Sequence, residues 1–288
     1  MQVSISRWAR PVALLGVLLT SLVHAEPGDR KRLGKAGNWK NTVAGAVLKN
    51  NLYSVESSGV LYSTDLKSGK WKPVGRAVFG RTKILLAANS SLYSIETDGN
   101  LYRINPANGG RHRIGKAGEW KNTLNGATAS NQLYSVEKSG ALYRTNSTTG
   151  QWKQLGKPEF AGTNLILGRD KVAYSETGIF TIETDGTLYN VNPSDGTWKN
   201  LGKPALWKGS KAGAIVSEVD TLYVVNDKGV LQWSVLAAGD DVKPIPMGKP
   251  IYKATKFLFV GHDGPMPSLY ALDSDGSLYA VEMAPMAG

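Results

Sequence analysis

The stretch SLYSIETDGNLY, residues 91–102, recurs in related form six times along the chain. In each copy two short apolar segments flank a turn that contains glycine, and their leading residues are nine positions apart, as from Leu92 to Leu101. Paired apolar segments around a glycine turn predict a β-hairpin with a fixed loop length. The copies start 40 to 47 residues apart, at Asn51, Ser91, Gln132, Gly178, Thr221 and Ser268.

Each hairpin lies between two further segments that are suited to strands. An apolar run precedes it, such as VAGAVL at residues 43–48, and a charged segment that often contains tryptophan follows it, such as GQWKQLGK at residues 150–157. The first segment is typical of an inner strand and the second of an outer, edge strand. Four antiparallel strands in every repeat predict one blade of a β-propeller.

The sixth hairpin lacks an outer strand, because the chain ends six residues after Glu282. The segment GDRKRLGK at residues 28–35 matches the outer-strand pattern, although no hairpin precedes it. We therefore predict an all-β fold, a single six-bladed β-propeller of four-stranded antiparallel blades over residues 26–288, in which residues 28–35 close the last blade and remove an open edge. The predicted blades span about residues 36–76, 77–116, 117–157, 158–203, 204–249, and 250–282 plus 28–35.

Residues 1–25 have the pattern of a signal peptide. Arg7 and Arg10 precede an apolar run that ends at Val23-His24-Ala25. The run is short for a membrane span, so a retained anchor is the less favoured alternative. The chain has no cysteine and therefore no disulfide, lipid-attachment or thiolate chemistry. We expect cleavage after Ala25, a periplasmic or secreted protein, and no transmembrane segment after cleavage.

The formal net charge is +11. A basic surface attracts anionic glycans, lipid headgroups or nucleic acid, but charge alone indicates solubility and non-specific association. We expect a glycan or another anionic or polar envelope ligand as the partner, and no nucleic acid.

The segments that join the blades are the first candidates for a binding site. GKAGNWKNT at residues 34–42 returns as GKAGEWKNT at residues 115–123. In a four-stranded meander these junctions and the hairpin turns share one end of the sheet, so they gather on one face of the propeller. Aromatic rings beside polar groups suit sugars. The candidate ligand-binding residues are Trp39, Phe79, Trp120, Phe160, Trp207 and Tyr252, with Lys35, Lys116 and Lys203.

Two interpretations of these rings stay open. They either stack on sugars or fill gaps between neighbouring blades. The polar surroundings of Trp120 predict that its ring is exposed. For the hairpin Leu-Tyr pairs the second interpretation is favoured, because blades pack face to face. The acids before the hairpin glycines are expected to serve turn solvation or local hydrogen bonding; they are Glu56, Glu96, Glu137, Glu183 and Asp273.

The hairpin pattern, the outer strand with tryptophan and the GKAGEWKN junction together resemble tectonin repeats, a family of tachylectin-2-like β-propeller lectins. The resemblance covers residues 28–282. It implies sugar binding in near-equivalent pockets between blades, on the side of the junction loops, with the family's junction tryptophan at Trp39, Trp120 and Trp207. The chain departs from the family in having one unit more than tachylectin-2 and in placing Phe79, Phe160 and Tyr252 at that position in the other blades.

An enzyme is the least favoured class. The sequence contains no HExxH, Gly-x-Ser-x-Gly or phosphate-binding loop in a suitable context. His112 is expected in an outer strand and His262 in a solvated loop, so we predict no catalytic residues, no metal and no cofactor. We expect a secreted or periplasmic, lectin-like binding protein.

The main alternative is a propeller that binds a protein in the envelope, as an inhibitor or immunity-type protein does. A single partner would favour irregular loops over repeated ones. Repetition is lost at residues 171–178, 239–246 and 261–267, all in blades four to six.

Overall fold

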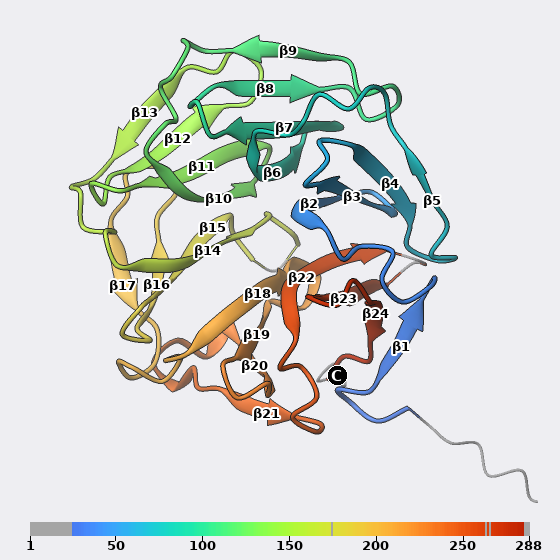
Figure 1. The fold of residues 1–288 in the computed structure, drawn as a ribbon. Coiled ribbons are helices and arrows are strands. Elements are labelled where there is room, and N and C mark those ends of the chain that lie inside the picture. The colour runs from blue at the N-terminus through green and yellow to red at the C-terminus, as the bar shows by residue number, and fades with distance from the viewer. Residues whose placement is uncertain (1–24, 174, 263, 265, 285–288) are drawn as a thin grey trace, which may run out of the picture.

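The computed structural model describes residues 25–173, 175–262, 264 and 266–284, and within them the chain forms six four-stranded antiparallel sheets around a central axis (Figure 1). The predicted all-β, six-bladed propeller is confirmed. Apart from Ala25, the predicted signal peptide lies outside the described residues. Within the described part of the chain, helix is limited to two short 3-10 segments, η1 (Ser217–Val219) and η2 (Leu236–Asp241).

The first three blades each run outward from the axis in chain order. Blade 1 contains β2 (Thr42–Leu48), β3 (Asn51–Glu56), β4 (Leu61–Asp65) and β5 (Trp71–Pro73). Blade 2 contains β6 (Thr82–Ala88), β7 (Ser91–Glu96), β8 (Leu101–Ile104) and β9 (Arg111–Ile114). Blade 3 contains β10 (Thr123–Ala129), β11 (Gln132–Glu137), β12 (Leu142–Asn146) and β13 (Trp152–Leu155).

The last three blades follow the same order, except that the chain's first strand completes the sixth. Blade 4 contains β14 (Thr163–Arg169), β15 (Gly178–Glu183), β16 (Leu188–Val191) and β17 (Trp198–Asn200). Blade 5 contains β18 (Ser210–Val216), β19 (Thr221–Asn226), β20 (Leu231–Val235) and β21 (Ile245–Met247). Blade 6 contains β22 (Thr255–His262), β23 (Pro267–Asp273), β24 (Leu278–Val281) and β1 (Arg30–Leu33).

The ring closes where β1 pairs antiparallel with β24. Arg30 lies opposite Val281 and Leu33 lies opposite Leu278. Figure 1 shows this contact as the blue first strand lying beside the dark red last one. The prediction that the N-terminal segment closes the last blade is confirmed.

Hydrophobic contacts between blades form most of the core. One cluster joins Tyr93 and Ile95 of blade 2 to Leu133 of blade 3, and the other blade interfaces have equivalent clusters. Tyr93 and Tyr134, the first tyrosines of their hairpins, are buried between blades as expected. The second tyrosine of each such hairpin is only half-buried, because alternation along the strand turns it to the opposite face.

Every innermost strand contains a β-bulge one residue after its start. The pairing register shifts at the same point in all six blades, for example between Thr82 and Ile84. A bulge re-aims a side chain out of the regular alternation. The residues at the bulges are Val43, Lys83, Leu124, Asn164, Lys211 and Lys256.

Candidate functional site

The six junction aromatics are buried, with side chains no more than 3 % exposed: Trp39, Phe79, Trp120, Phe160, Trp207 and Tyr252. Trp120 packs against Leu86 of blade 2 and Leu133 of blade 3. Its backbone N–H donates to the Gly99 carbonyl, 3.0 Å away in the preceding hairpin turn, which holds the ring between the blades. The expectation that Trp120 is exposed is therefore wrong, and these rings offer no free face for stacking on a sugar.

The junction lysines differ from these rings in their exposure to solvent. Lys35, Lys116 and Lys203 are exposed, whereas the aromatic side chains beside them in sequence lie inside. The structure thus does not bring lysine and aromatic ring together as one surface. Ligand contacts by these lysines stay a prediction.

The hairpin acids hold the inner strands through local hydrogen bonds. Glu137 accepts a hydrogen bond from the Thr123 hydroxyl at 2.5 Å, and Glu183 accepts one from Thr163 at 2.9 Å. Glu137 is buried, so the local hydrogen-bonding interpretation holds for it and turn solvation does not. Burial raises the pKa of Glu137, opposed by the Thr123 hydrogen bond and the charge of Lys83.

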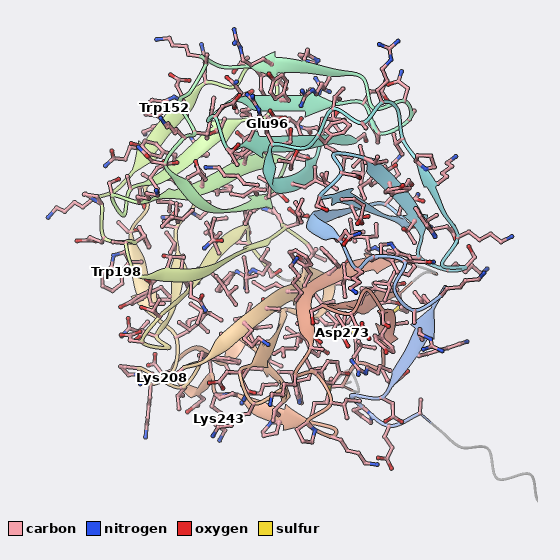
Figure 2. The ribbon with its side chains drawn as sticks, viewed as in Figure 1. Glu96, Trp152, Trp198, Lys208, Lys243 and Asp273 are labelled. Carbon is pink, nitrogen blue, oxygen red and sulfur yellow. The ribbon has the colours of Figure 1, made fainter. Side chains whose placement is uncertain are left out.

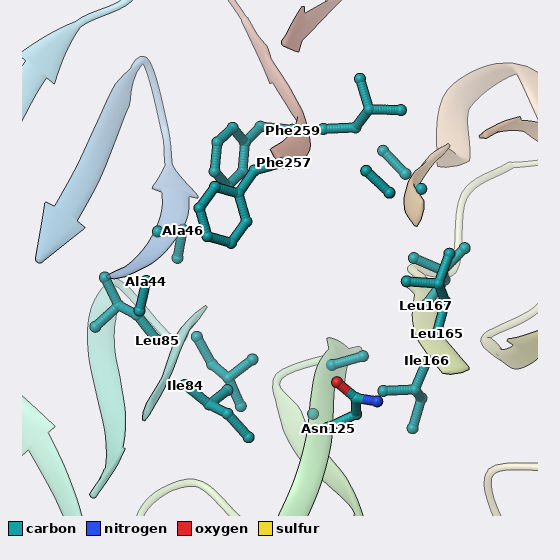
Figure 3. Close-up of a pocket in the computed structure, with 18 of the residues that line it drawn as sticks. Ala44, Ala46, Ile84, Leu85, Asn125, Leu165, Ile166, Leu167, Phe257 and Phe259 are labelled. Atoms are coloured by element: carbon teal, nitrogen blue, oxygen red, sulfur yellow. The ribbon is translucent and has the colours of Figure 1, made fainter. Parts of the chain in front are cut away.

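The central cavity has a volume of about 520 Å³ and lies between the six innermost strands (Figure 3). Its wall includes Leu85, Leu165 and Phe257, and three bulge lysines line it as well. The lysines bind the next blade instead of projecting freely: Lys83 donates to the carbonyls of Trp120, Lys121 and Thr123, Lys211 to that of Lys253, and Lys256 to that of Thr42. These side chains fasten neighbouring blades together.

The exposed aromatic residues lie on the outer strands. Trp71, Trp152 and Trp198 are 39 %, 45 % and 43 % exposed, and Figure 2 shows Trp152 and Trp198 at the rim of the disc. Each packs edge-on against a hairpin tyrosine, with ring centroids 4.3 to 4.7 Å apart. The pairs are Tyr62–Trp71, Tyr143–Trp152 and Tyr189–Trp198.

A second cavity, here named the rim cavity, lies in blade 3 beside one of these pairs. Its volume is about 250 Å³. It combines an exposed ring with carboxylate, amide and hydroxyl groups. The Glu119 carboxylate accepts a hydrogen bond of 3.0 Å from the backbone N–H of Lys116. The residues that line it are Glu119, Trp120, Asn122, Glu137, Ser139, Tyr143 and Trp152.

The rim cavity uses one predicted residue, Trp120, but only as a buried wall. Sequence reasoning assigned Trp152 to an outer strand and did not place it in a site. The sequence signal that could have pointed to Trp152 is the Trp-Lys pair that follows a glycine turn in blades 1, 3 and 4. This pair lies in an edge strand, which has no neighbouring strand on its outer side.

The two histidines among the described residues lie at separate surface positions. His112 is exposed in β9, the outer strand of blade 2, as expected. His262 ends β22, with its Nε2 3.0 Å from Glu218 Oε1. Among the described residues no three His, Asp or Glu side chains gather as a metal site.

No protein-family model and no curated protein matches the chain. Solved structures are similar in fold. A protein of unknown function from Bacteroides thetaiotaomicron has 15 % sequence identity and a TM-score of 0.58, over 89 % of this chain and 73 % of that chain. YCF48 from Cyanidioschyzon merolae has 14 % identity and a TM-score of 0.55, over 90 % and 99 %. The computationally designed Ika8 protein has 14 % identity and a TM-score of 0.51, over 84 % and 71 %.

These likenesses show the fold alone: the chain has a β-propeller architecture. Within the described residues, no helix is long and apolar enough to cross a membrane.

Proposed function

We propose that the protein is a non-enzymatic, lectin-like propeller that binds a glycan in the rim cavity of blade 3. The observation that supports this most is the exposed Trp152 ring, held edge-on by Tyr143 beside the polar groups of Glu119, Asn122 and Ser139. An aromatic face covers the apolar C–H side of a pyranose, while carboxylate, amide and hydroxyl groups bind its hydroxyls.

Pre-organisation favours binding at this position. The edge contact between Tyr143 and Trp152 fixes the indole before a ligand arrives, so less side-chain entropy is lost on binding. The wall on the inner side is the buried Trp120, which the core holds in place.

Repetition supports several weak sites on one molecule. Blades 1 and 4 carry the same tryptophan–tyrosine pair, and in blade 4 the Trp198 indole donates to Glu159 Oε2 at 2.8 Å. Linked weak sites gain avidity on a polymer that displays repeated sugars. The resemblance to tectonin repeats agrees with a site on the junction side. It differs in that the lining of the rim cavity comes from one blade and its junction, and the exposed ring comes from an outer strand.

The signal-peptide pattern of residues 1–25 supports action outside the cytoplasm, in the periplasm or the medium. A glycan of the cell envelope or of another cell is accordingly the proposed ligand. No cofactor is needed for such binding.

A glycan array followed by calorimetry tests the proposal. Trp152→Ala should weaken binding of the best glycan at least ten-fold while the melting temperature stays near that of the wild type. His112→Ala, an exposed outer-strand change in blade 2, is the matched control and should bind normally. Unchanged binding by Trp152→Ala would refute the rim cavity as the site.

A protein partner is the second candidate, because the irregular loops of blades 4 to 6 contact one another on the opposite face. The Asp170 N–H donates to Ser217 Oγ at 3.0 Å, and the side chains of His262 and Glu218 are in contact. Replacing the loop residues 170–177 with the two-residue turn of blade 3 should remove a partner captured from envelope extract and leave glycan binding intact. Capture that survives the replacement would contradict this candidate.

A further inference from the structure

In blades 2 and 6 an arginine occupies the register position that Trp152 has in blade 3. Trp152 is the first residue of β13 and pairs with Thr145, three residues after Leu142. In the same register, Arg111 pairs with Ile104 in blade 2, and Arg30 pairs with Val281 in blade 6.

In blade 2 the side chain of Arg111 occupies the position that corresponds to the rim cavity of blade 3. Its guanidinium contacts the Glu96 carboxylate and lies over the Tyr102 ring, 4.4 Å from the centroid, and over the Phe79 ring, 5.4 Å from the centroid. By position in the repeat, Glu96, Tyr102 and Phe79 correspond to Glu137, Tyr143 and Trp120, which all line the rim cavity.

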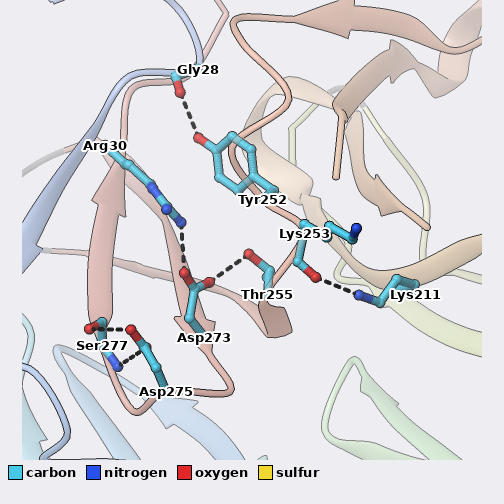
Figure 4. A network of polar contacts seen from close by, with 9 residues as sticks. All are labelled: Gly28, Arg30, Lys211, Tyr252, Lys253, Thr255, Asp273, Asp275 and Ser277. Carbon is cyan, nitrogen blue, oxygen red and sulfur yellow. Dashed lines mark hydrogen bonds and ion pairs between the residues drawn. The ribbon is translucent and has the colours of Figure 1, made fainter. Parts of the chain in front are cut away.

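Blade 6 repeats this arrangement, and Figure 4 shows its Arg30, Asp273 and Tyr252. Arg30 Nη1 lies 2.8 Å from Asp273 Oδ2, and the guanidinium lies 4.1 Å from the Tyr279 ring centroid and 5.3 Å from that of Tyr252. Two blades thus fill the space with an internal cation that has the same partners, a buried carboxylate and two aromatic rings.

Blade 3 retains the carboxylate and both rings but has no arginine at this position. Trp152 lies at the edge instead of inside, and the cavity remains. We propose that the rim cavity of blade 3 binds a cationic nitrogen group and that, on a glycan, this group is the ammonium of an amino sugar without its N-acetyl group. The inference rests on the proposed function and specifies its ligand class.

The chemistry of the site supports this class. An ammonium can donate to the Glu137 carboxylate while the Tyr143 and Trp152 rings attract its charge. The Glu119 carboxylate adds negative charge at the mouth. A bound cation also compensates the desolvation of Glu137, as Arg111 does for Glu96. Burial raises the pKa of Glu96, and the charge of Arg111 opposes this rise.

Cleavage after Ala25 would remove Arg7 and Arg10, and the positive net charge that remains works against a cationic ligand at long range. Exposed charges more than about 8–10 Å away are largely screened at physiological salt, whereas a partly buried contact is screened less. Affinity for the ammonium ligand should therefore hold or rise when salt is increased. Affinity of an anionic ligand for the positively charged protein would fall.

The test compares a fully deacetylated glucosamine tetramer with the N-acetylglucosamine tetramer, and uses methylguanidinium as the minimal probe. The deacetylated tetramer should bind at least ten-fold more tightly. Glu137→Gln, which keeps an acceptor for Thr123, should remove the preference. Trp152→Arg should fill the cavity as Arg111 does, abolish binding and leave a folded protein, whereas the neighbouring Lys153→Arg should change nothing.

The outcomes separate the two proposals. Equal binding of both tetramers, unaffected by Glu137→Gln, overturns the cation inference and leaves glycan binding standing. Binding of methylguanidinium that depends on Glu137, without binding of any glycan, supports the cation inference and refutes the glycan function. No binding of any of the three probes overturns the cation inference, and the glycan function is refuted as well only when the array also shows no bound glycan. Unimpaired binding by a folded Trp152→Arg protein also overturns the inference, and this readout remains if Glu137→Gln fails to fold.

Discussion

Arg30 in the first strand and Asp273 in the last blade form an ion pair, with 2.8 Å between Nη1 and Oδ2, at the place where the ring closes (Figure 4). Nearby, the Tyr252 hydroxyl donates to the Gly28 carbonyl at 2.7 Å. The side chains of Arg30 and Asp273 are 18 % and 3 % exposed, so the pair is largely removed from solvent. Both contacts fasten the N-terminal segment to blades that are more than 200 residues away in sequence.

Arg30→Ala should destabilise the protein by up to about 3 kcal/mol, because it leaves the buried Asp273 carboxylate without its cation. Thermal or chemical unfolding measures the change. Arg32→Ala in the same strand is the matched control and should alter stability by no more than about 0.5 kcal/mol, since its side chain is exposed. Equal losses for the two variants would mean that the ion pair does not stabilise closure.

Trp120→Ala should cost about 3–5 kcal/mol of stability, because the ring fills the interface between blades 2 and 3. Trp152→Ala removes a half-exposed ring and should cost about 1 kcal/mol or less. Melting curves of the two variants provide the comparison. A Trp120→Ala protein that melts like the wild type would contradict the buried position of this ring.

Stability and ligand binding should respond to pH in opposite directions through Glu137. Burial raises its pKa above the ordinary 4.5, so the folded state holds this proton more tightly than the unfolded chain. The contribution of Glu137 to stability is therefore greatest below pH 4.5 and decreases as pH rises through the raised pKa. Binding of an ammonium ligand needs the ionised carboxylate and should increase over the same window.

Glu137→Gln isolates this effect from the other buried acids. The charged and titratable groups facing Glu137 are Lys83 from β6, Glu119 from the junction and Tyr143 from β12. The difference in melting temperature between wild type and variant should change with pH, and the variant's binding should lose the corresponding rise. A pH-independent difference would contradict the raised pKa.

Chelator and reductant should leave the melting temperature unchanged. The sequence has no cysteine, and the described residues contain no cluster of metal-ligating side chains. A fall of several degrees in EDTA, reversed by a divalent cation, would show that a metal stabilises the propeller.

The architecture was predictable because the repeat is local and regular. The spacing of nine positions from Leu92 to Leu101 specifies the hairpin, and the outer-strand pattern of residues 28–35 specifies the closure. Each pattern is visible in a short stretch of sequence, and both predictions are confirmed by the pairing of the strands.

The candidate site was harder to predict because burial is decided between blades. Trp120 lies in a polar segment, yet its N–H contact with Gly99 places the ring in the core. Likewise, Arg111 and Trp152 are recognised as equivalent only when the strand register places them at the same position of their blades. A local window of sequence contains neither relationship.

The most direct test of the rim cavity as the binding site is an NMR titration that follows the tryptophan indole N–H signals. The probe is the glucosamine tetramer, followed by the best glycan from the array. The Trp152 signal should shift most and saturate with ligand, while the buried Trp39 and Trp207 signals stay in place. Saturable binding that leaves the Trp152 signal unmoved would contradict the account.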